Sequence, residues 1–309
     1  MSDMTGRTIV VGVDGSIRSV EAARWAAREA VRHEAGLELV HASYLSYALE
    51  DDRTGEDGAL LEAFSAASTE APGLSIETLS KVDQPVHYLL QRSHDAAMIV
   101  LGTHPGNSIS GAVFGSVAQA VAAHAVCPVV IIGGGKQIRT PDSGAVVVGV
   151  SPHPGGLEAM QFAFAEAELR GCDVIALRSW GDVDWSAGRL GYNSELFTEW
   201  RRMEMNVLNE CLAPVEEKFP AVTVHRQLKG TRPTLALEQS ARGARLLVVG
   251  AHRSDDHWFS RLGPVPSWLL HRSPCPLVVV GQPHQQPAEL AETDAQTDAR
   301  ADSRDAVTT

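Results

Sequence analysis

Residues 8–14 read TIVVGVD, and residues 145–151 repeat this string almost unchanged as AVVVGVS. Each is a continuous Val/Ile run that ends in a turn, which is typical of a strand buried on both faces of a sheet. Two more repeats follow in the same order, DAAMIVLGTH (95–104) with GARLLVVGAH (243–252) and HAVCPVVIIGG (124–134) with HRSPCPLVVVGQ (271–282). Three ordered matches predict two copies of one fold.

The repeats divide the chain of 309 residues into two domains, 1–140 and 144–284, joined through the turn stretch PDSG at 141–144. The offset between matching residues grows from 137 to 148, so the second copy carries about eleven extra residues, which we assign to GDVDWSAGRLGYNSELF (181–197). Residues 285–309 are acidic, polar and free of aromatic side chains. This composition is typical of a disordered tail.

Apolar stretches of strand length alternate with helical stretches in the first copy. We expect strands near 8–13, 37–43, 74–81, 97–102 and 127–132, with helices near 17–34, 57–70, 84–95 and 115–125. Val/Ile/Leu-rich strands separated by helices indicate a parallel sheet that is covered on both faces. The predicted fold class is therefore α/β, with two tandem, doubly wound, parallel five-stranded sheets. Ligands of such sheets bind beyond the carboxyl ends of the strands.

Composition narrows the function classes. The formal net charge is −12 with no basic stripe, which argues against nucleic acid or an anionic membrane as a partner. No apolar run approaches the ~20 residues of a membrane span, and MSDMTGRTIV (1–10) lacks a signal-peptide pattern, so we expect a cytoplasmic protein. The four cysteines form no C-x-x-C pair. Cys127 and Cys275 hold equivalent places, which favours a buried packing role over redox sensing. HRSDDH (252–257) is interpreted as a solvated loop rather than a metal site.

Two loops lie at the predicted carboxyl edge of the first sheet. The longer is GTHPGNSISGAVFGS (102–116), whose Gly115-Ser116 pair opens a helix. The free N–H groups and positive dipole end of that helix suit a phosphate, although Ser116 could equally be a simple N-cap. The shorter loop carries Asp14. Its carboxylate could bind ribose hydroxyls or a divalent cation, or it could cap the next helix.

The stretches VVGVDGS, GTHPGNSISGAVFGSV and HAVCPVVII resemble the universal stress proteins, here in tandem form over about 280 of the 309 residues. The resemblance implies Rossmann-like domains and ATP bound in the first copy. Nucleotide-binding members carry Gly, two residues, Gly, nine residues, then Gly and Ser or Thr. Gly102, Gly115 and Ser116 fit this pattern, but Pro105 stands in place of the second glycine. Pro105 offers no N–H to a phosphate.

The same resemblance implies a role for each residue of the site. Asp14 would face the ribose or Mg²⁺, and Ala42 would meet the adenine through its backbone. The remaining predicted residues would surround the ribose and the phosphates: Gly15, Gly102, Thr103, Gly115, Ser116 and Val117.

The second copy departs further from the pattern. Ser151 replaces the aspartate, Arg253 takes the place of the second glycine, and Pro264 follows Gly263 where serine belongs. Pro264 removes a backbone donor and a hydroxyl donor. Charge-assisted hydrogen bonds contribute roughly 1.5–3 kcal/mol each, so both losses together cost ~10²-fold or more in affinity. The point charge of Arg253 could recover part of it. We expect a degenerate site with a structural or regulatory role.

Three functions remain open. The first is an ATP-binding regulatory protein of the stress response, without catalytic activity, that acts on an unidentified protein partner. The second is an interaction module without nucleotide, and the third is a slow ATPase. A catalyst needs a positioned base and a cationic clamp near the γ-phosphate. The first loop offers Asp14 and, less well, His104, but no lysine or arginine. We therefore predict no catalytic residue.

The final strands of the two copies predict how the halves pack. In the family that the chain resembles, single-domain subunits pair along their last strands. Here VCPVVII (126–132) and PLVVVG (276–281) could make that contact within one chain. Both are apolar and β-branched, and an open edge of this kind invites aggregation. We therefore expect an intramolecular pseudo-dimer. Whether the whole chain forms a homodimer is left open.

Overall fold

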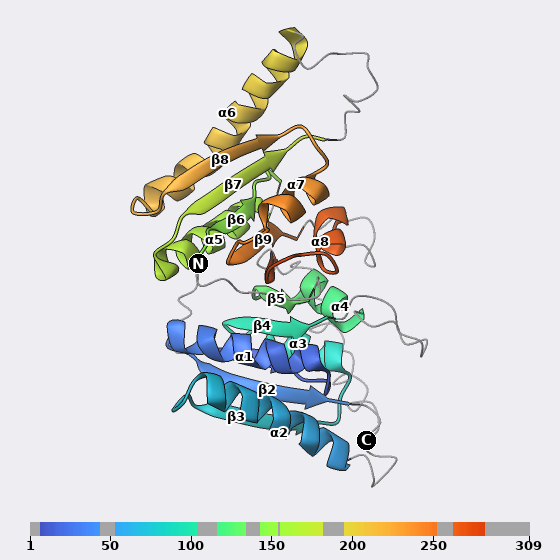
Figure 1. Cartoon of the computed structure of the whole chain (residues 1–309). Helices are drawn as coiled ribbons and strands as arrows, with labels where there is room; N and C mark the ends of the chain where they lie inside the picture. Colours follow the sequence, from blue (N-terminus) through green and yellow to red (C-terminus); the bar gives the residue numbers. More distant parts are fainter. Residues whose placement is uncertain are drawn as a thin grey trace, which may run out of the picture.

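The computed structural model describes residues 7–43, 53–103, 116–133, 143–153, 155–181, 195–251 and 262–281. Its first domain contains five strands and four helices that alternate along the chain (Figure 1). They are β1 Thr8–Gly12, α1 Ile17–Arg32, β2 Gly36–Ala42, α2 Arg53–Glu70, β3 Ile76–Lys81, α3 Pro85–Arg92, β4 Met98–Gly102, α4 Ser116–His124 and β5 Val129–Ile132. These bounds confirm the elements expected from the sequence to within a few residues at each end.

The second domain repeats the same order. Its elements are β6 Val146–Gly149, α5 Gly156–Arg170, β7 Val174–Ser179, α6 Glu195–Lys218, β8 Val224–Lys229, α7 Pro233–Ser240, β9 Leu246–Gly250, α8 Pro264–Leu269 and β10 Leu277–Val280. α6 is six residues longer than its counterpart α2, with 24 residues against 18. Most of the predicted insertion, 182–194, lies outside the described residues, as do HRSDDH and the acidic tail.

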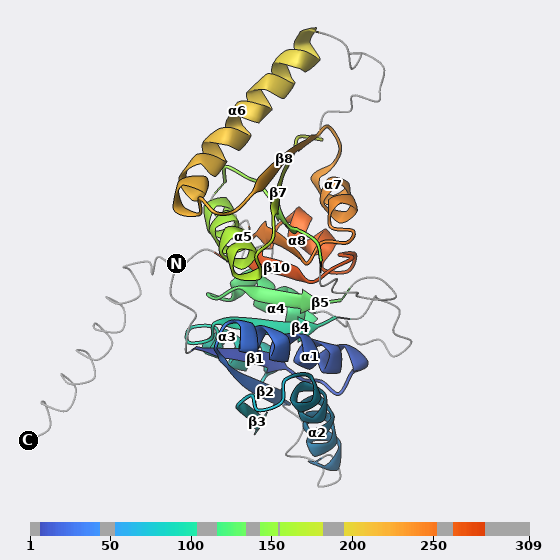
Figure 2. The ribbon, with the colours of Figure 1, turned by 60° about the vertical axis from the view of Figure 1, so that its left-hand side comes forward.

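The two sheets join into one. The strand order is β3-β2-β1-β4-β5-β10-β9-β6-β7-β8, and every neighbouring pair is parallel except β5 with β10. In that central antiparallel pair, Val130 lies opposite Val278. Figure 2 shows β5 and β10 side by side in the middle of the molecule. The predicted pairing of the last strands is thus confirmed, and it turns two five-stranded sheets into a continuous ten-stranded one.

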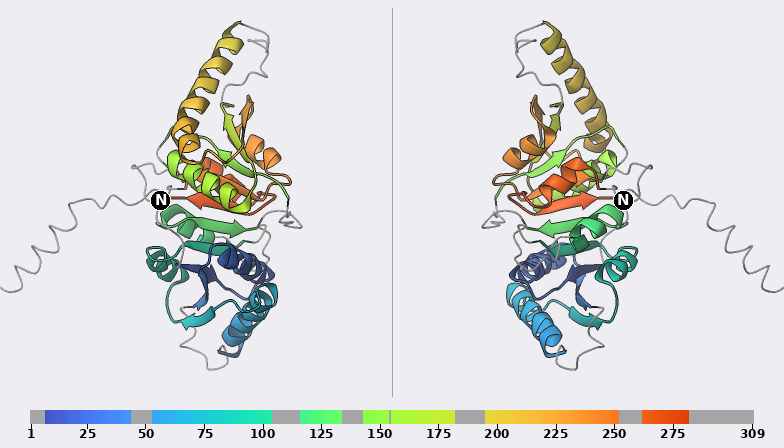
Figure 3. Two further views of the ribbon diagram at one scale, coloured as in Figure 1. Left: turned by 90° about the vertical axis from the view of Figure 1, so that its left-hand side faces the viewer. Right: turned by 90° about the vertical axis from the view of Figure 1, so that its right-hand side faces the viewer.

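Helices cover both faces of the sheet, as the doubly wound prediction requires. Helices α1, α2, α5 and α6 pack on one face, and α3, α4, α7 and α8 pack on the other. Along β1, Ile9 and Val11 face the first layer and Val10 faces the second, and all three side chains are fully buried. Figure 3 shows α6 reaching past the sheet at the far end of the second domain. Among the described residues, no helix is both long and apolar enough to cross a bilayer.

Small residues let α1 lie close to the sheet. Its buried face consists mainly of alanines at helical spacing, Ala22, Ala23, Ala26, Ala27 and Ala30, all without exposed surface. Ser16 caps the N-terminus, because its hydroxyl accepts a hydrogen bond from the Ser19 N–H. The sequence places this helix directly after β1, so its first turn stands at the carboxyl edge of the sheet.

A cluster of ionisable side chains is buried where α1 of the first domain meets α5 of the second. Arg170 pairs with Glu166 on its own helix, and its Nη2 lies 2.6 Å from Glu29 Oε2 on α1. His33 Nε2 lies 3.2 Å from Glu166 Oε1, and Arg32 Nη1 lies 2.5 Å from Glu29 Oε1. Glu29, His33 and Glu166 are close enough to ligate a cation, but Arg170 already takes that place between the two carboxylates. The cluster therefore joins the halves by charge.

The two equivalent cysteines are packing residues in this structure. Cys127 is 7% exposed and Cys275 is 1% exposed, each just before the last strand of its domain. Burial raises the pKa of both thiols to about 12, so they stay protonated at neutral pH. A thiol in that state is a poor nucleophile, which agrees with the packing role predicted for them.

Candidate functional site

The carboxyl edge of the first sheet holds a cavity of about 120 Å³. The ends of β1, β2 and β4 form its floor, and the N-terminal parts of α3 and α4 form its walls. It is lined by Gly12, Val13, Asp14, Val40, His41, Ala42, Pro85, Leu89, Leu101, Gly102, Val117 and Ala118. Four predicted site residues that are far apart in the sequence, Asp14, Ala42, Gly102 and Val117, are therefore brought together.

Asp14 lies in the turn between β1 and α1. Its Oδ1 accepts a hydrogen bond from the Ser16 N–H at 3.0 Å, and Gly15 adopts φ +77°, where a side chain would be strained. Ser16, not Asp14, is the N-cap of α1. Asp14 is exposed at the mouth of the cavity, so its carboxylate is accessible to a ligand while one oxygen holds the turn.

Gly102 has a packing reason that the sequence pattern does not reveal. A Cβ at this position would lie 2.6 Å from the Arg18 backbone carbon and 2.8 Å from the Ser19 nitrogen. Only glycine lets the end of β4 approach the first turn of α1 so closely. Gly250 holds the same place in the second domain, where a Cβ would lie 2.5 Å from the Gly155 carbonyl oxygen. The glycine therefore serves the fold in both copies, whatever it does for a ligand.

Other predicted residues lie elsewhere. Thr103 is 3% exposed, and its hydroxyl donates to the Leu270 carbonyl oxygen of the second domain at 3.3 Å. Its side chain thus serves the contact between the halves. Ser116 is the exposed first residue of α4, next to Val117 of the cavity wall. Gly115 and Pro105 lie outside the described residues.

Several lining residues were missed by the sequence reasoning. Pro85 and Leu89 of α3 close one wall, and His41 lies at the end of β2, with its Nδ1 2.8 Å from the Val13 carbonyl oxygen. The repeat contained a signal for the two α3 residues. Pro85 and Leu89 recur as Pro233 and Leu237, at the offset of 148 residues that also relates the later strands of the two copies. Nothing in the local sequence marked His41.

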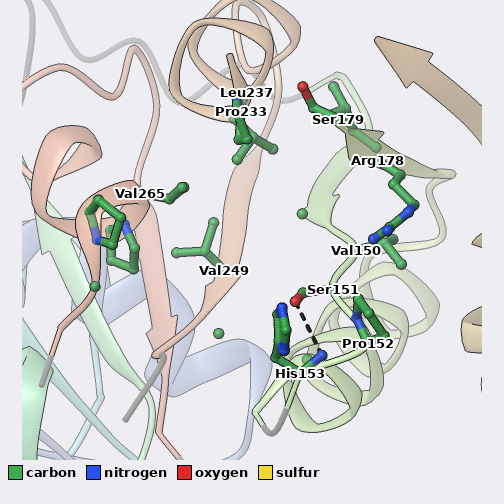
Figure 4. Close-up of a pocket in the computed structure, with 17 residues that line it drawn as sticks. Val150, Ser151, Pro152, His153, Arg178, Ser179, Pro233, Leu237, Val249 and Val265 are labelled. Carbon is green, nitrogen blue, oxygen red and sulfur yellow. Dashed lines mark hydrogen bonds between the residues drawn. The ribbon is translucent and has the colours of Figure 1, made fainter. Parts of the chain in front are cut away.

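The second domain has a cavity of about 400 Å³ at the equivalent place. Each residue that lines the first cavity has a counterpart in the wall of the second, such as Ser151 for Asp14, Ser179 for Ala42 and Val265 for Val117. In Figure 4, Val249 and Val265 lie on one side of this pocket, with Val150 and Arg178 on the other.

The N-terminal turn of α8 is the part of this pocket that differs most from its counterpart in the first domain, the N-terminal turn of α4. Pro264 is the first residue of α8, directly after Gly263, whose φ is +75°. Pro264 and Pro266 carry no N–H, and the Ser267 N–H donates to the Gly263 carbonyl oxygen at 3.2 Å. The helix therefore presents few donors to an anion, as expected from the sequence.

Comparison with known proteins agrees with this architecture. The model of the universal stress protein family matches twice, over residues 6–133 and 144–281. A universal stress protein of Mycolicibacterium smegmatis is 30% identical over 286 residues, which are 88% of this chain and 96% of the relative.

The comparison with solved structures concerns the fold. A universal stress protein from Archaeoglobus fulgidus has the same fold, with a TM-score of 0.65 at 16% identity, covering 89% of this chain and 98% of its own. A universal stress protein solved in complex with cAMP matches 41% of this chain and 97% of its own at 28% identity, with a TM-score of 0.34. With the family model matching both halves, this chain belongs to the universal stress protein family and carries two of its domains in tandem.

Proposed function

We propose that the protein is an ATP-binding regulator of the stress response and that its first domain holds the nucleotide. One observation carries the proposal: the residues to which the family resemblance gives a ligand role, Asp14, Ala42, Gly102 and Val117, line a single cavity. That cavity lies beyond the carboxyl ends of parallel strands, where doubly wound sheets bind their ligands.

Different residues of the cavity would contact different parts of the nucleotide. Small-molecule sites typically measure about 300–1,000 Å³, so a cavity of about 120 Å³ suits the adenine ring rather than a whole nucleotide. Val40, Leu89 and Leu101 offer apolar contact to the ring, and the backbone at Ala42 offers hydrogen bonds to its edge. The ribose and the phosphates would then lie outside, between Asp14 and the exposed start of α4.

The polar groups at the mouth of the cavity suit nucleotide binding better than catalysis. Ser116 and the first N–H groups of α4 would hold phosphate oxygens, aided by the helix dipole. Mg²⁺ would be held by Asp14 together with the phosphates, since one carboxylate and phosphate oxygens are a common magnesium ligand set. Among the described residues that line the cavity, none is a lysine or an arginine. Without a cationic clamp for a transferred phosphoryl group, ATP acts as a signal that occupies the domain.

The ligand released from the purified chain tests this function. Heat denaturation followed by mass spectrometry should yield ATP at no more than one molecule per chain, and incubation with ATP should produce no ADP above the buffer blank. Asp14→Ala should weaken ATP binding about 10- to 100-fold, because a charge-assisted hydrogen bond contributes roughly 1.5–3 kcal/mol. If the purified chain carries no nucleotide and does not bind ATP at millimolar concentration, it would instead be an interaction module.

A further inference from the structure

The N-terminal end of α6 has no helical counterpart in the first domain. The last residue of α6, Lys218, corresponds to the last residue of α2, Glu70, at the offset of 148 residues that relates the later parts of the two copies. The six additional residues of α6, 195–200, therefore all lie at its N-terminus. Figure 1 shows this end of α6 at the top of the molecule, beyond the ends of β7 and β8. The second domain thus carries a helical extension of its own.

Two apolar faces run along α6. The first consists of Leu208, Leu212 and Val215, which are fully buried in the core layer beneath the helix. The second consists of Trp200, Met203 and Val207, which recur at helical spacing about a third of a turn away from the first face. Trp200 is 39% exposed and Met203 is 51% exposed. Within the described part of the chain, this second face is left largely open to solvent.

Contacts with the end of β7 hold the extension in place. The ring of Phe197 packs against that of Trp180, with 6.4 Å between the ring centroids. One turn further on, Glu204 Oε2 accepts a hydrogen bond from Arg178 Nε at 2.5 Å, and both side chains are about 15% exposed. The exposed face therefore lies on a helix that is already fixed to the domain, so a partner would pay little to order it.

Charged residues beside the exposed face suit a second copy of the same helix. Glu199 and Arg202 border it on one side, with 2.7 Å between Arg202 Nη2 and Glu199 Oε1, and both side chains are more than half exposed. When two α6 helices cross antiparallel between Trp200 and Arg201, Glu199 of each copy lies opposite Arg202 of the other. The same patch then forms both sides of a two-fold interface, as in most homodimers.

We propose that the protein forms a homodimer through the N-terminal part of α6. Trp200 and Met203 pack against the same residues of a second copy, and Glu199 pairs with Arg202 across the two-fold axis. The helices overlap over only a few turns, and interfaces that bury less than about 1,200 Å² are typical of transient complexes. The dimer is therefore reversible and depends on protein concentration.

Analytical ultracentrifugation of the full chain, from low micromolar to millimolar concentration and without nucleotide, tests the proposal. The wild type should shift from monomer to dimer. Trp200→Glu should raise the dissociation constant at least about 10-fold, because buried aromatic residues are the usual hot spots of interfaces. The matched control is Leu61→Glu on α2, since Leu61 is 68% exposed on the equivalent helix of the first domain. The control should dimerise like the wild type, and thermal melts show that each variant is folded.

Two charge variants test the two-fold pairing itself. Glu199→Arg and Arg202→Glu each place like charges opposite one another in a homodimer, so each variant alone should stay monomeric at concentrations where the wild type is dimeric. In an equimolar mixture the two variants should associate, because every charge then faces its opposite.

The outcomes do not depend on ATP binding. A wild-type chain that stays monomeric at millimolar concentration overturns the proposal. A dimer that Trp200→Glu leaves as stable as before also overturns it, because that dimer would use another surface. A mixture of the two charge variants that associates no better than either variant alone overturns the pairing of Glu199 with Arg202 and, with it, the proposed interface.

Discussion

Replacing Arg170 by methionine tests whether charge joins the two halves. The Arg170 side chain is 3% exposed and pairs with Glu166 and Glu29, which are 3% and 5% exposed. Methionine fills much of the same space without charge, so the variant leaves two buried carboxylates with only Arg32 and His33 nearby. Breaking a buried pair by removing one partner costs about 3–5 kcal/mol. We expect the free energy of unfolding to fall by this amount.

Urea unfolding at pH 7, followed by circular dichroism, measures the effect. Arg226→Met is the matched control, because Arg226 pairs with Glu216 at 2.6 Å but both side chains are about one-third exposed. An exposed pair contributes about 0–1 kcal/mol. In the double variant Arg170→Met/Glu166→Gln, one orphaned charge is gone and part of the loss should be recovered. A cost of Arg170→Met within about 1 kcal/mol of Arg226→Met would refute the role assigned to the cluster.

Three further changes follow from the structure. Burial alone would raise the pKa of Glu166, but the nearby His33 ring and the charge of Arg170 hold it below its ordinary value of 4.5. As the pH falls, the Glu166 carboxylate is therefore protonated in the unfolded chain before it is protonated in the folded one. The stability that Glu166 contributes is complete above about pH 4.5 and is lost as the pH falls through its lower folded pKa. In a pH series of urea midpoints, Glu166→Gln should flatten the fall in this acidic range. Cys127 and Cys275, with pKa values of about 12, should resist iodoacetamide at pH 8 in the native chain and react in urea, and mass spectrometry showing native labelling at either would refute their buried state. Gly102→Ala should lower the melting temperature, because its Cβ would meet backbone of α1 at 2.6 Å, whereas Gly58→Ala on α2, with nothing within 4 Å, should raise it; equal melting temperatures for the two variants would contradict this packing.

The strands and their pairing could be predicted because their physics is local and repeated. The Val/Ile runs of β1 and β6 are apolar on both faces, and only a sheet covered by helices on both sides buries them. The final strands, β5 and β10, are apolar, and an exposed edge on either would invite aggregation. This reasoning predicted that they pair within the chain, and the structure confirms it. The joined sheet follows from that pairing.

The rest depended on tertiary contacts that no sequence pattern encodes. Glu29 and Glu166 are each separated from their partners on the other helix by more than 130 residues, so their cluster exists only once α1 meets α5. The family resemblance assigned Thr103 to the surroundings of the ribose and phosphates, yet its hydroxyl donates to the Leu270 carbonyl oxygen of the other half. Gly102 fits the nucleotide-binding pattern, but it is also required for close packing against α1. Only the distances from its position to the α1 backbone reveal this packing requirement.

Calorimetric titration of the full chain with ATP in the presence of Mg²⁺ tests the central claim, that the first domain binds ATP and the second does not. Pro264 and Ser151 stand where the second domain would need donors and a carboxylate, whereas the proposal assigns these roles in the first domain to Ser116 and Asp14. The account predicts one ATP site per chain, which Ala42→Phe removes. Two sites of similar affinity, or a single site that Ala42→Phe leaves intact, would contradict it.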